Sequence, residues 1–192
     1  MISDKELATR VAISGDQRAF TLLVDRHQSA IRNYLRRLMA GDDATADDLS
    51  QETFLAAFLK MSSWRGTAKF STWLHTIAYR KFLDYQRKHK RHLVMAVVPD
   101  AGHNSGKAVE NEIMAQHLMG LLKPKDRAVM TLAYAAGMSH AEIATVVDQP
   151  LGSIKARIHR AKLKLNHWLS KNDHSIQTQT TNQIAKREGR HA

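Results

Sequence analysis

The sequence predicts an all-helical protein of two small domains joined by a flexible linker, the second of which contains a helix-turn-helix. Three observations support this class. Apolar residues recur at three- and four-residue spacing over most of the chain, residues 138–166 hold two such patterns around a proline turn, and residues 93–108 lose the period. We place the first domain at 1–92, the linker at 93–108, the second domain at 109–170 and a polar tail at 171–192. We expect the tail to be disordered or weakly helical.

Charge and composition narrow the kinds of partner that the chain can have. The 192 residues carry a formal charge of +11, which favours a polyanion such as nucleic acid. The chain opens polar and acidic, and no apolar run approaches bilayer length, so we expect no signal peptide and no membrane insertion. Cysteine is absent, which excludes disulfides and Cys-ligated zinc and fits a cytoplasmic protein. The 11 histidines are scattered without a metal motif, and we expect neither a metal nor another cofactor.

The first domain opens with helical patterns over residues 4–40, where Asp16 is expected to cap the second helix. Gly41 to Asp43 form a break, and the next helix is expected from Asp47. One side of that helix is apolar and should pack inward: Leu49, Phe54, Leu55 and Phe58. The other side is acidic or polar: Asp47, Asp48, Gln51 and Glu52. In so basic a chain this acidic surface indicates a protein partner, unless its carboxylates only complement the helix dipole in a first turn.

A turn-rich loop over residues 62–69 holds Trp64 among cations, and a helix with Trp73 and Ile77 on its apolar side follows. We expect Trp73 to belong to the core. Trp64 either stacks on an unpaired base or packs beneath the loop, since an indole suits both environments. The helix ends in a dense basic run at residues 80–92, which we interpret as a phosphate-binding patch; a solvated helix end is the alternative.

The second domain contains the two short helical patterns of residues 138–166. Ser139 and Glu142 have the spacing of a capping box at the start of the first pattern. Asp148, Gln149 and Pro150 form a turn, because proline lacks a backbone donor and disfavours helical geometry in the residue before it. The second helix should therefore begin near Leu151.

This second helix has one apolar face and one small, basic face. Four residues at helical spacing should be buried: Ile154, Ile158, Ala161 and Leu165. The opposite face is flanked by Lys155 and is centred on four residues, most of them small or cationic: Ala156, His159, Arg160 and Leu163. Small groups permit close approach to the major groove, and cations reach base edges and phosphates, so we interpret the helix as a recognition helix. An ordinary amphipathic helix with a solvated basic face is the alternative.

Taken together, these features resemble the sigma-70 family of bacterial sigma factors, in its compact extracytoplasmic-function (ECF) group. GDQRAFTLLVDRH with DDLSQETFLAAF resembles the start of region two, and WRGTAKFSTWLHTIAYRKFLDYQRKHKR resembles its end. LKPKDRAVMTLAYAAGMSHAEIATVVDQPLGSIKARIHRAKLKL resembles region four. The resemblance covers roughly residues 10–170, and the order and spacing of the stretches make it specific.

The resemblance implies a function and partners. It predicts a non-enzymatic factor that directs core RNA polymerase to specific promoters and aids promoter opening. The implied partners are promoter DNA, core RNA polymerase through the β′ clamp helices and the β subunit, and an anti-sigma factor. A polymerase-independent helix-turn-helix regulator is the alternative, but it leaves the acidic helix and the Trp64 loop without a role.

The resemblance also assigns residues to each partner. Core polymerase is assigned Asp48, Leu49, Gln51, Glu52 and Phe54. The minus-ten element is assigned Trp64, Arg65, Ile77, Ala78, Arg80 and Arg87. The minus-thirty-five element is assigned Ser153, Lys155, Ala156, His159 and Arg160. Ala156 stands where many members have Ser, and Arg80 where many have Asn, so the promoter sequence itself is not predicted.

Overall fold

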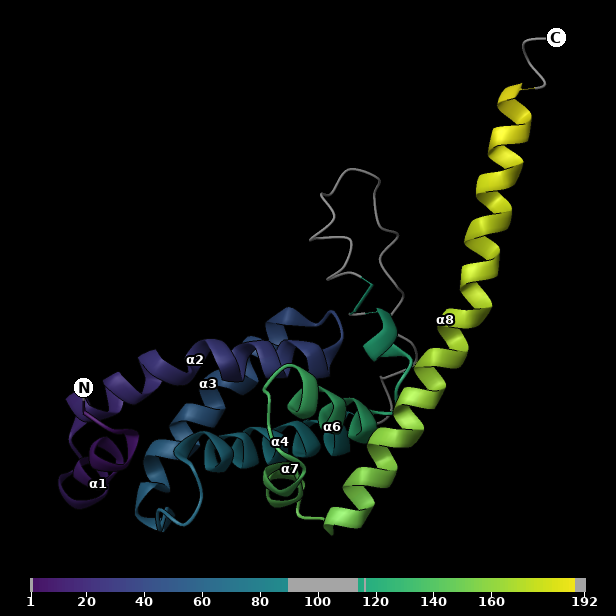
Figure 1. Ribbon diagram of the computed structural model, residues 1–192. Coiled ribbons are helices and arrows are strands. Elements are labelled where there is room, and N and C mark those ends of the chain that lie inside the picture. Colours follow the sequence, from purple (N-terminus) through teal and green to yellow (C-terminus); the bar gives the residue numbers. More distant parts are fainter. Residues whose placement is uncertain (1, 90–113, 116, 189–192) are drawn as a thin grey trace.

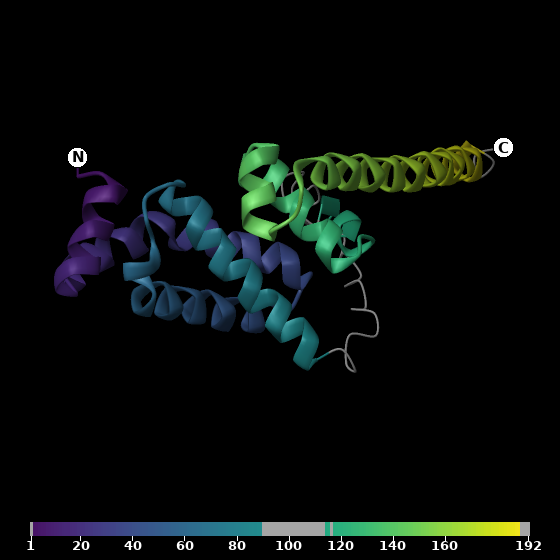
Figure 2. The same cartoon turned by 90° about the horizontal axis from the view of Figure 1, so that it is seen from below.

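The computed structural model describes residues 2–89, 114, 115 and 117–188, with side chains of the last helix described through residue 172 (Figures 1 and 2). All regular structure within these residues is helical, which confirms the predicted fold class. The linker predicted at 93–108 lies outside the described residues. No helix in the described ranges is long and apolar enough to cross a membrane.

Residues 2–89 of the first domain form four α-helices and one 3-10 turn: α1 (Asp4–Ser14), α2 (Gln17–Met39), α3 (Asp43–Leu59), η1 (Met61–Ser63) and α4 (Phe70–Lys88). Asp16 caps α2 as predicted, since its carboxylate accepts a hydrogen bond from the backbone N–H of Ala19 at 3.0 Å. Large side chains that are fully buried, including Leu23, Leu35 and Phe82, form the core between the helices.

The helix α3 begins at Asp43, four residues before the predicted start. The cause is Asp42, whose carboxylate accepts a hydrogen bond from the backbone N–H of Thr45 at 3.1 Å and so caps the helix. Asp47 therefore lies beyond the first turn, where complementing the helix dipole has little effect. It forms ion pairs with Arg32 at 3.0 Å and Arg36 at 3.2 Å instead.

The second domain contains α6 (Pro124–Tyr134), α7 (His140–Val147) and α8 (Leu151–Glu188). The capping box of Ser139 and Glu142 is present, and Asp148 takes a left-handed conformation (φ 53°) in the turn before α8. The sequence predicts a disordered or weakly helical tail from residue 171. In the structure, α8 continues as a helix through this segment to Glu188. No proline or glycine interrupts residues 167–188, so the backbone hydrogen bonding can propagate.

The two domains pack directly against each other. The helix α7 lies on α4 and α6 lies on α2, while α8 extends away from the rest of the molecule (Figures 1 and 2). Lys69, which precedes α4, forms an ion pair with Glu142 of α7 at 2.9 Å. Arg127 of α6 donates a hydrogen bond to the carbonyl oxygen of Leu38 in the last turn of α2 at 2.8 Å. A cation at a helix C-terminus also complements the helix dipole.

Candidate nucleic-acid and protein interfaces

The first helix of the second domain's helix-turn-helix, α7, buries Ile143, Val146 and Val147, and α8 buries the stripe predicted for it: Ile154, Ile158, Ala161 and Leu165. All five residues that the sequence assigned to the minus-thirty-five element are exposed: Ser153, Lys155, Ala156, His159 and Arg160. The buried stripe fixes the rotation of α8, so these exposed residues form one face that is free to enter a major groove.

Arg157, at the side of the same helix, sets the position of α8 within the domain. Its guanidinium forms an ion pair with Asp126 of α6 at 2.6 Å and donates a hydrogen bond to the side chain of Gln149 at 3.3 Å. Both partners precede α8 in the sequence, one in the supporting helix and one in the turn. These charge-assisted contacts of the half-buried arginine fix the orientation of α8, and Arg157 itself is not part of the exposed face.

Trp64 packs beneath its loop. Its ring meets Phe70 edge to face, with centroids 5.7 Å apart, and Phe70 in turn contacts Trp73 and His27. Trp64 remains partly exposed, while its indole N–H is buried without an acceptor in the described structure. Arg65, the next residue, is exposed. The loop thus exposes the Arg65 side chain at the surface, while the indole ring of Trp64 is partly buried against the aromatic cluster.

The helix α4 separates its assigned residues into two groups. Arg80 and Arg87 are exposed on one face, where Arg87 also pairs with Asp84. Ile77 and Ala78 are buried, with exposures of 8% and 0%, so in this arrangement their side chains do not reach the surface. The helix α4 contacts α2 and α3 of its own domain and also α7 of the second domain.

The predicted protein-binding residues on α3 divide in the same way. Asp48, Gln51 and Glu52 are exposed, whereas Leu49 and Phe54 belong to the core side of the helix. Glu52 forms an ion pair with Lys81 of α4 at 2.8 Å, and its side chain stays 56% exposed. Of the acidic surface predicted from the sequence, Asp48, Gln51 and Glu52 are exposed, whereas Asp47 forms ion pairs with arginines of α2.

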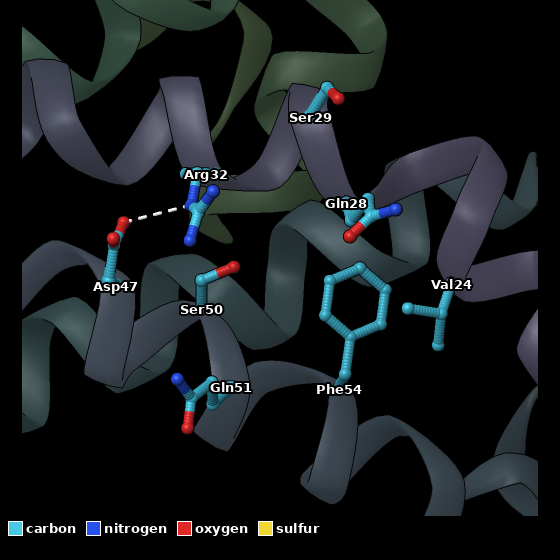
Figure 3. Close-up of a pocket in the computed structure, with 8 residues that line it drawn as sticks. All are labelled: Val24, Gln28, Ser29, Arg32, Asp47, Ser50, Gln51 and Phe54. Carbon is cyan, nitrogen blue, oxygen red and sulfur yellow. Dashed lines mark ion pairs between the residues drawn. The ribbon is translucent and has the colours of Figure 1, made fainter.

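A pocket of about 340 Å³ adjoins this surface, between α2 and α3 (Figure 3). Gln51 and Phe54 of α3 line it opposite Val24 and Gln28 of α2, and the ion pair of Arg32 with Asp47 closes one end. Its lining combines the apolar side chains of Val24 and Phe54 with the amides of Gln28 and Gln51.

Sequence reasoning missed the apolar part of the α3 surface. Leu55 was expected to pack inward, yet 62% of it is exposed, and Leu59, one turn further on, is 72% exposed. Leu55 lies between the buried residues Phe54 and Ala57, and α3 has apolar residues on several sides. Periodicity alone therefore cannot choose which side faces the core. The signal that could have found the pair is its spacing from Asp48 and Glu52, which places all four residues on one face.

Comparison with known proteins matches both domains. Residues 23–92 match the family model of sigma-70 region 2, and residues 113–165 match that of sigma-70 region 4. The ECF RNA polymerase sigma-E factor of Salmonella typhimurium is 31% identical over 177 residues, covering 84% of this chain and 91% of that protein.

Two solved structures are similar over most of their length. CnrH, in a structure of its complex with the cytosolic domain of CnrY, is 29% identical with a TM-score of 0.69, covering 88% of this chain and 98% of that one. The sigma factor RpoE of Bartonella quintana, in complex with the anti-sigma factor NepR, has a TM-score of 0.66 at 23% identity and covers 79% of this chain and 96% of that one. The latter likeness concerns the fold alone.

Proposed function

This chain belongs to the sigma-70 family of RNA polymerase sigma factors, in the ECF group, and we propose that it directs core RNA polymerase to promoters by reading two DNA elements. The observation that carries the proposal is the presence of two different surfaces in one chain. The exposed face of α8 is small and cationic, as DNA requires, whereas α3 exposes carboxylates in a chain with a net charge of +11.

The second domain is proposed to read the minus-thirty-five element in the major groove. Lys155, His159 and Arg160 supply donors for base edges and phosphates, Ser153 supplies a hydroxyl, and the methyl group of Ala156 suits the methyl group of thymine. Arg157 contributes indirectly through its contacts with Asp126 and Gln149.

The first domain is proposed to hold the minus-ten element as unpaired bases. Arg65, next to the half-buried ring of Trp64, and Arg80 and Arg87, further along α4, are exposed cations. Ile77 and Ala78 are proposed to support this surface from beneath, because their side chains are buried. Extruding a base costs a few kcal/mol, which stacking and edge contacts must offset.

Core polymerase is proposed to dock on α3 through Asp48, Gln51 and Glu52. Leu49 and Phe54 maintain the shape of that surface, and Phe54 also lines the adjoining pocket. In the similar structures, CnrH is in complex with the cytosolic domain of CnrY, and RpoE is in complex with the anti-sigma factor NepR. We propose that this chain also has an anti-sigma partner, and that co-purification from its native host will recover it.

Binding to purified core RNA polymerase tests the proposal. We expect wild-type chain to bind core and to support transcription from members of a promoter library, and Glu52→Lys to reduce core binding. Asp25→Lys, at an exposed acid of α2, is the matched control and should leave binding unchanged. A chain that binds promoter duplex but not core polymerase would instead be a polymerase-independent regulator.

A further inference from the structure

The helix α1 lies beside the loop of Trp64 and Arg65, although it precedes the residues matched by the region 2 model. Leu7 and Ala8 are fully buried and Val11 is 4% exposed, so α1 is an integral part of the domain. It contacts η1 at the start of the loop, and both views show the two segments side by side at the same end of the molecule (Figures 1 and 2).

The first turn of α1 is tied to the aromatic cluster that supports the loop. Asp4 pairs with Arg26 and with the imidazole of His27, both at 2.8 Å. The ring of His27 packs on Phe70 at a centroid distance of 5.3 Å, and Phe70 in turn packs edge to face against Trp64. The position of the residue after Asp4 is therefore fixed relative to the loop.

That residue is Lys5, and its side chain runs along the loop. Its Cε lies 3.7 Å from the point that a Cβ would occupy on Gly66, which has a left-handed φ of 69°. Lys5 and Arg65 are both exposed, and neither has a side-chain partner among the described residues. Residues 60–69 contain three cations and no carboxylate. Lys69 is paired with Glu142 at 2.9 Å. Lys5 and Arg65 have no side-chain partner within the described ranges, so these two cations give this corner of the domain a positive potential.

We propose that Lys5 belongs to the nucleic-acid site of the first domain and binds a backbone phosphate of the unpaired strand held at the Trp64 loop. The inference rests on the proposed function of that loop. A flexible, strongly hydrated ammonium suits a phosphate, which requires no planar or bidentate partner. Such a contact positions the strand and carries no sequence information. The DNA-binding surface thus extends beyond the part of the chain that resembles the family model.

A salt titration of single-stranded DNA binding tests this role. Because a phosphate contact is independent of sequence, the probe is a fluorescent mixed-sequence DNA oligonucleotide of about 12 nucleotides, bound to the full-length chain. Lys5→Ala should weaken binding at low salt by roughly three- to tenfold and should make the log–log salt slope shallower by about 0.7, the value for one phosphate of a single strand. Lys5→Arg should retain the wild-type slope, because it keeps the charge.

Two further variants make the outcomes distinct. Arg18→Ala removes an exposed cation of α2 that has no side-chain partner in the described structure, and it should leave the slope unchanged. Arg65→Ala tests the loop itself. A loss of binding in Arg65→Ala but none in Lys5→Ala would overturn the role of Lys5 and leave the proposed function standing. Weaker binding of Lys5→Ala with an unchanged slope would also overturn it, since Lys5 would then only hold the loop. Insensitivity to both substitutions would reject the loop as a DNA site.

Discussion

At the scale of single residues, the exposed face of α8 combines two kinds of contact. Ala156 offers a methyl group and permits a close approach, whereas Arg160, four residues on, offers a planar fork of donors that matches a guanine edge. Arg160 is exposed and has no side-chain partner within the described residues, so it can bind DNA without breaking a contact with another described side chain. Of the face, it is the residue best suited to specify a base.

Arg160→Ala should weaken binding to a cognate minus-thirty-five duplex by about 1–3 kcal/mol if the side chain contacts a base. Fluorescence anisotropy measures the effect, with a duplex from a promoter that the library transcription identifies and with scrambled duplexes. The control is Lys125→Ala, at an exposed cation on α6. An equal loss on every sequence would mark Arg160 as a phosphate contact instead.

His75 makes the stability of the first domain depend on pH. Its Nδ1–H donates a hydrogen bond to the carbonyl oxygen of Ser71 at 2.8 Å, its ring packs on Tyr34, and its Nε2 is buried without a partner in the described structure. Burial lowers the pKa of His75 below its usual 6.5. The unfolded chain therefore binds a proton here more readily than the folded one, so the contribution of neutral His75 is complete above pH 6.5 and is lost as the pH falls.

We expect His75→Phe to flatten the fall in unfolding free energy between pH 7 and pH 5, because the ring volume remains and the titrating group is removed. Urea denaturation at several pH values measures it. If wild type and variant lose stability in parallel over that range, another group is responsible.

At the scale of elements, α3 carries a surface with a polar half and an apolar half. Asp48, Glu52, Leu55 and Leu59 follow one another at four-, three- and four-residue spacing and so share a face of the helix. The two leucines are among the most exposed large apolar side chains in the described structure. A partner helix that matches this face needs basic residues at one end and apolar residues at the other.

Leu55→Ser should reduce affinity for core polymerase by about 1–2 kcal/mol if the interface extends from the acidic half of this face to its apolar half, because the substitution removes exposed apolar area. Ile13→Ser, at an exposed apolar residue on α1, is the matched control, and thermal melting checks that both variants stay folded. Unchanged core affinity for Leu55→Ser would limit the interface to the acidic half of α3.

The elements also differ in how far the sequence determines them. The capping box at Ser139 and the buried stripe of α8 were predicted correctly, because local capping rules and a helix covered on one side leave a clear pattern. The start of α3 and the burial of Ala78 were not predicted. The first depends on a cap at Asp42, and Ala78 lies on a helix that contacts α2, α3 and α7. Contacts between domains leave no periodic signal, so the ion pair of Lys69 with Glu142 is visible only in the structure.

At the scale of the whole molecule, the two DNA-reading domains are held together. Burial raises the pKa of Tyr79 on α4, and the guanidinium of Arg157 on α8 lies close enough to oppose that shift. Promoter elements centred near minus ten and minus thirty-five are about 25 base pairs apart, or about 85 Å along B-DNA. Helices in contact cannot reach both, so binding both elements requires the domains to separate.

Separation must break the contacts of Arg127 and Lys69. Hydrogen bonding from Lys69, and then from Ser139, lowers the pKa of Glu142 to about 2, so the Glu142 carboxylate that binds Lys69 stays charged throughout the physiological range. Arg127 is the better residue to substitute in a test of domain separation, because it lies outside both proposed DNA surfaces. Its removal leaves the Leu38 carbonyl without this donor, and the expected cost to the closed form is about 1–2 kcal/mol.

We therefore expect Arg127→Ala to shift the chain toward a separated arrangement and to raise its apparent affinity for a bipartite promoter in the presence of core polymerase, since a larger fraction is competent to bind. The chain has no cysteine, so dyes on Thr21→Cys and Thr145→Cys, at exposed positions of α2 and α7, report the distance between domains. Energy transfer should fall in Arg127→Ala, should fall further on binding core polymerase, and should remain as in the parent in the control Lys125→Ala. Transfer that stays high in the polymerase complex would mean that the closed arrangement itself engages the promoter, and the requirement for opening would be wrong.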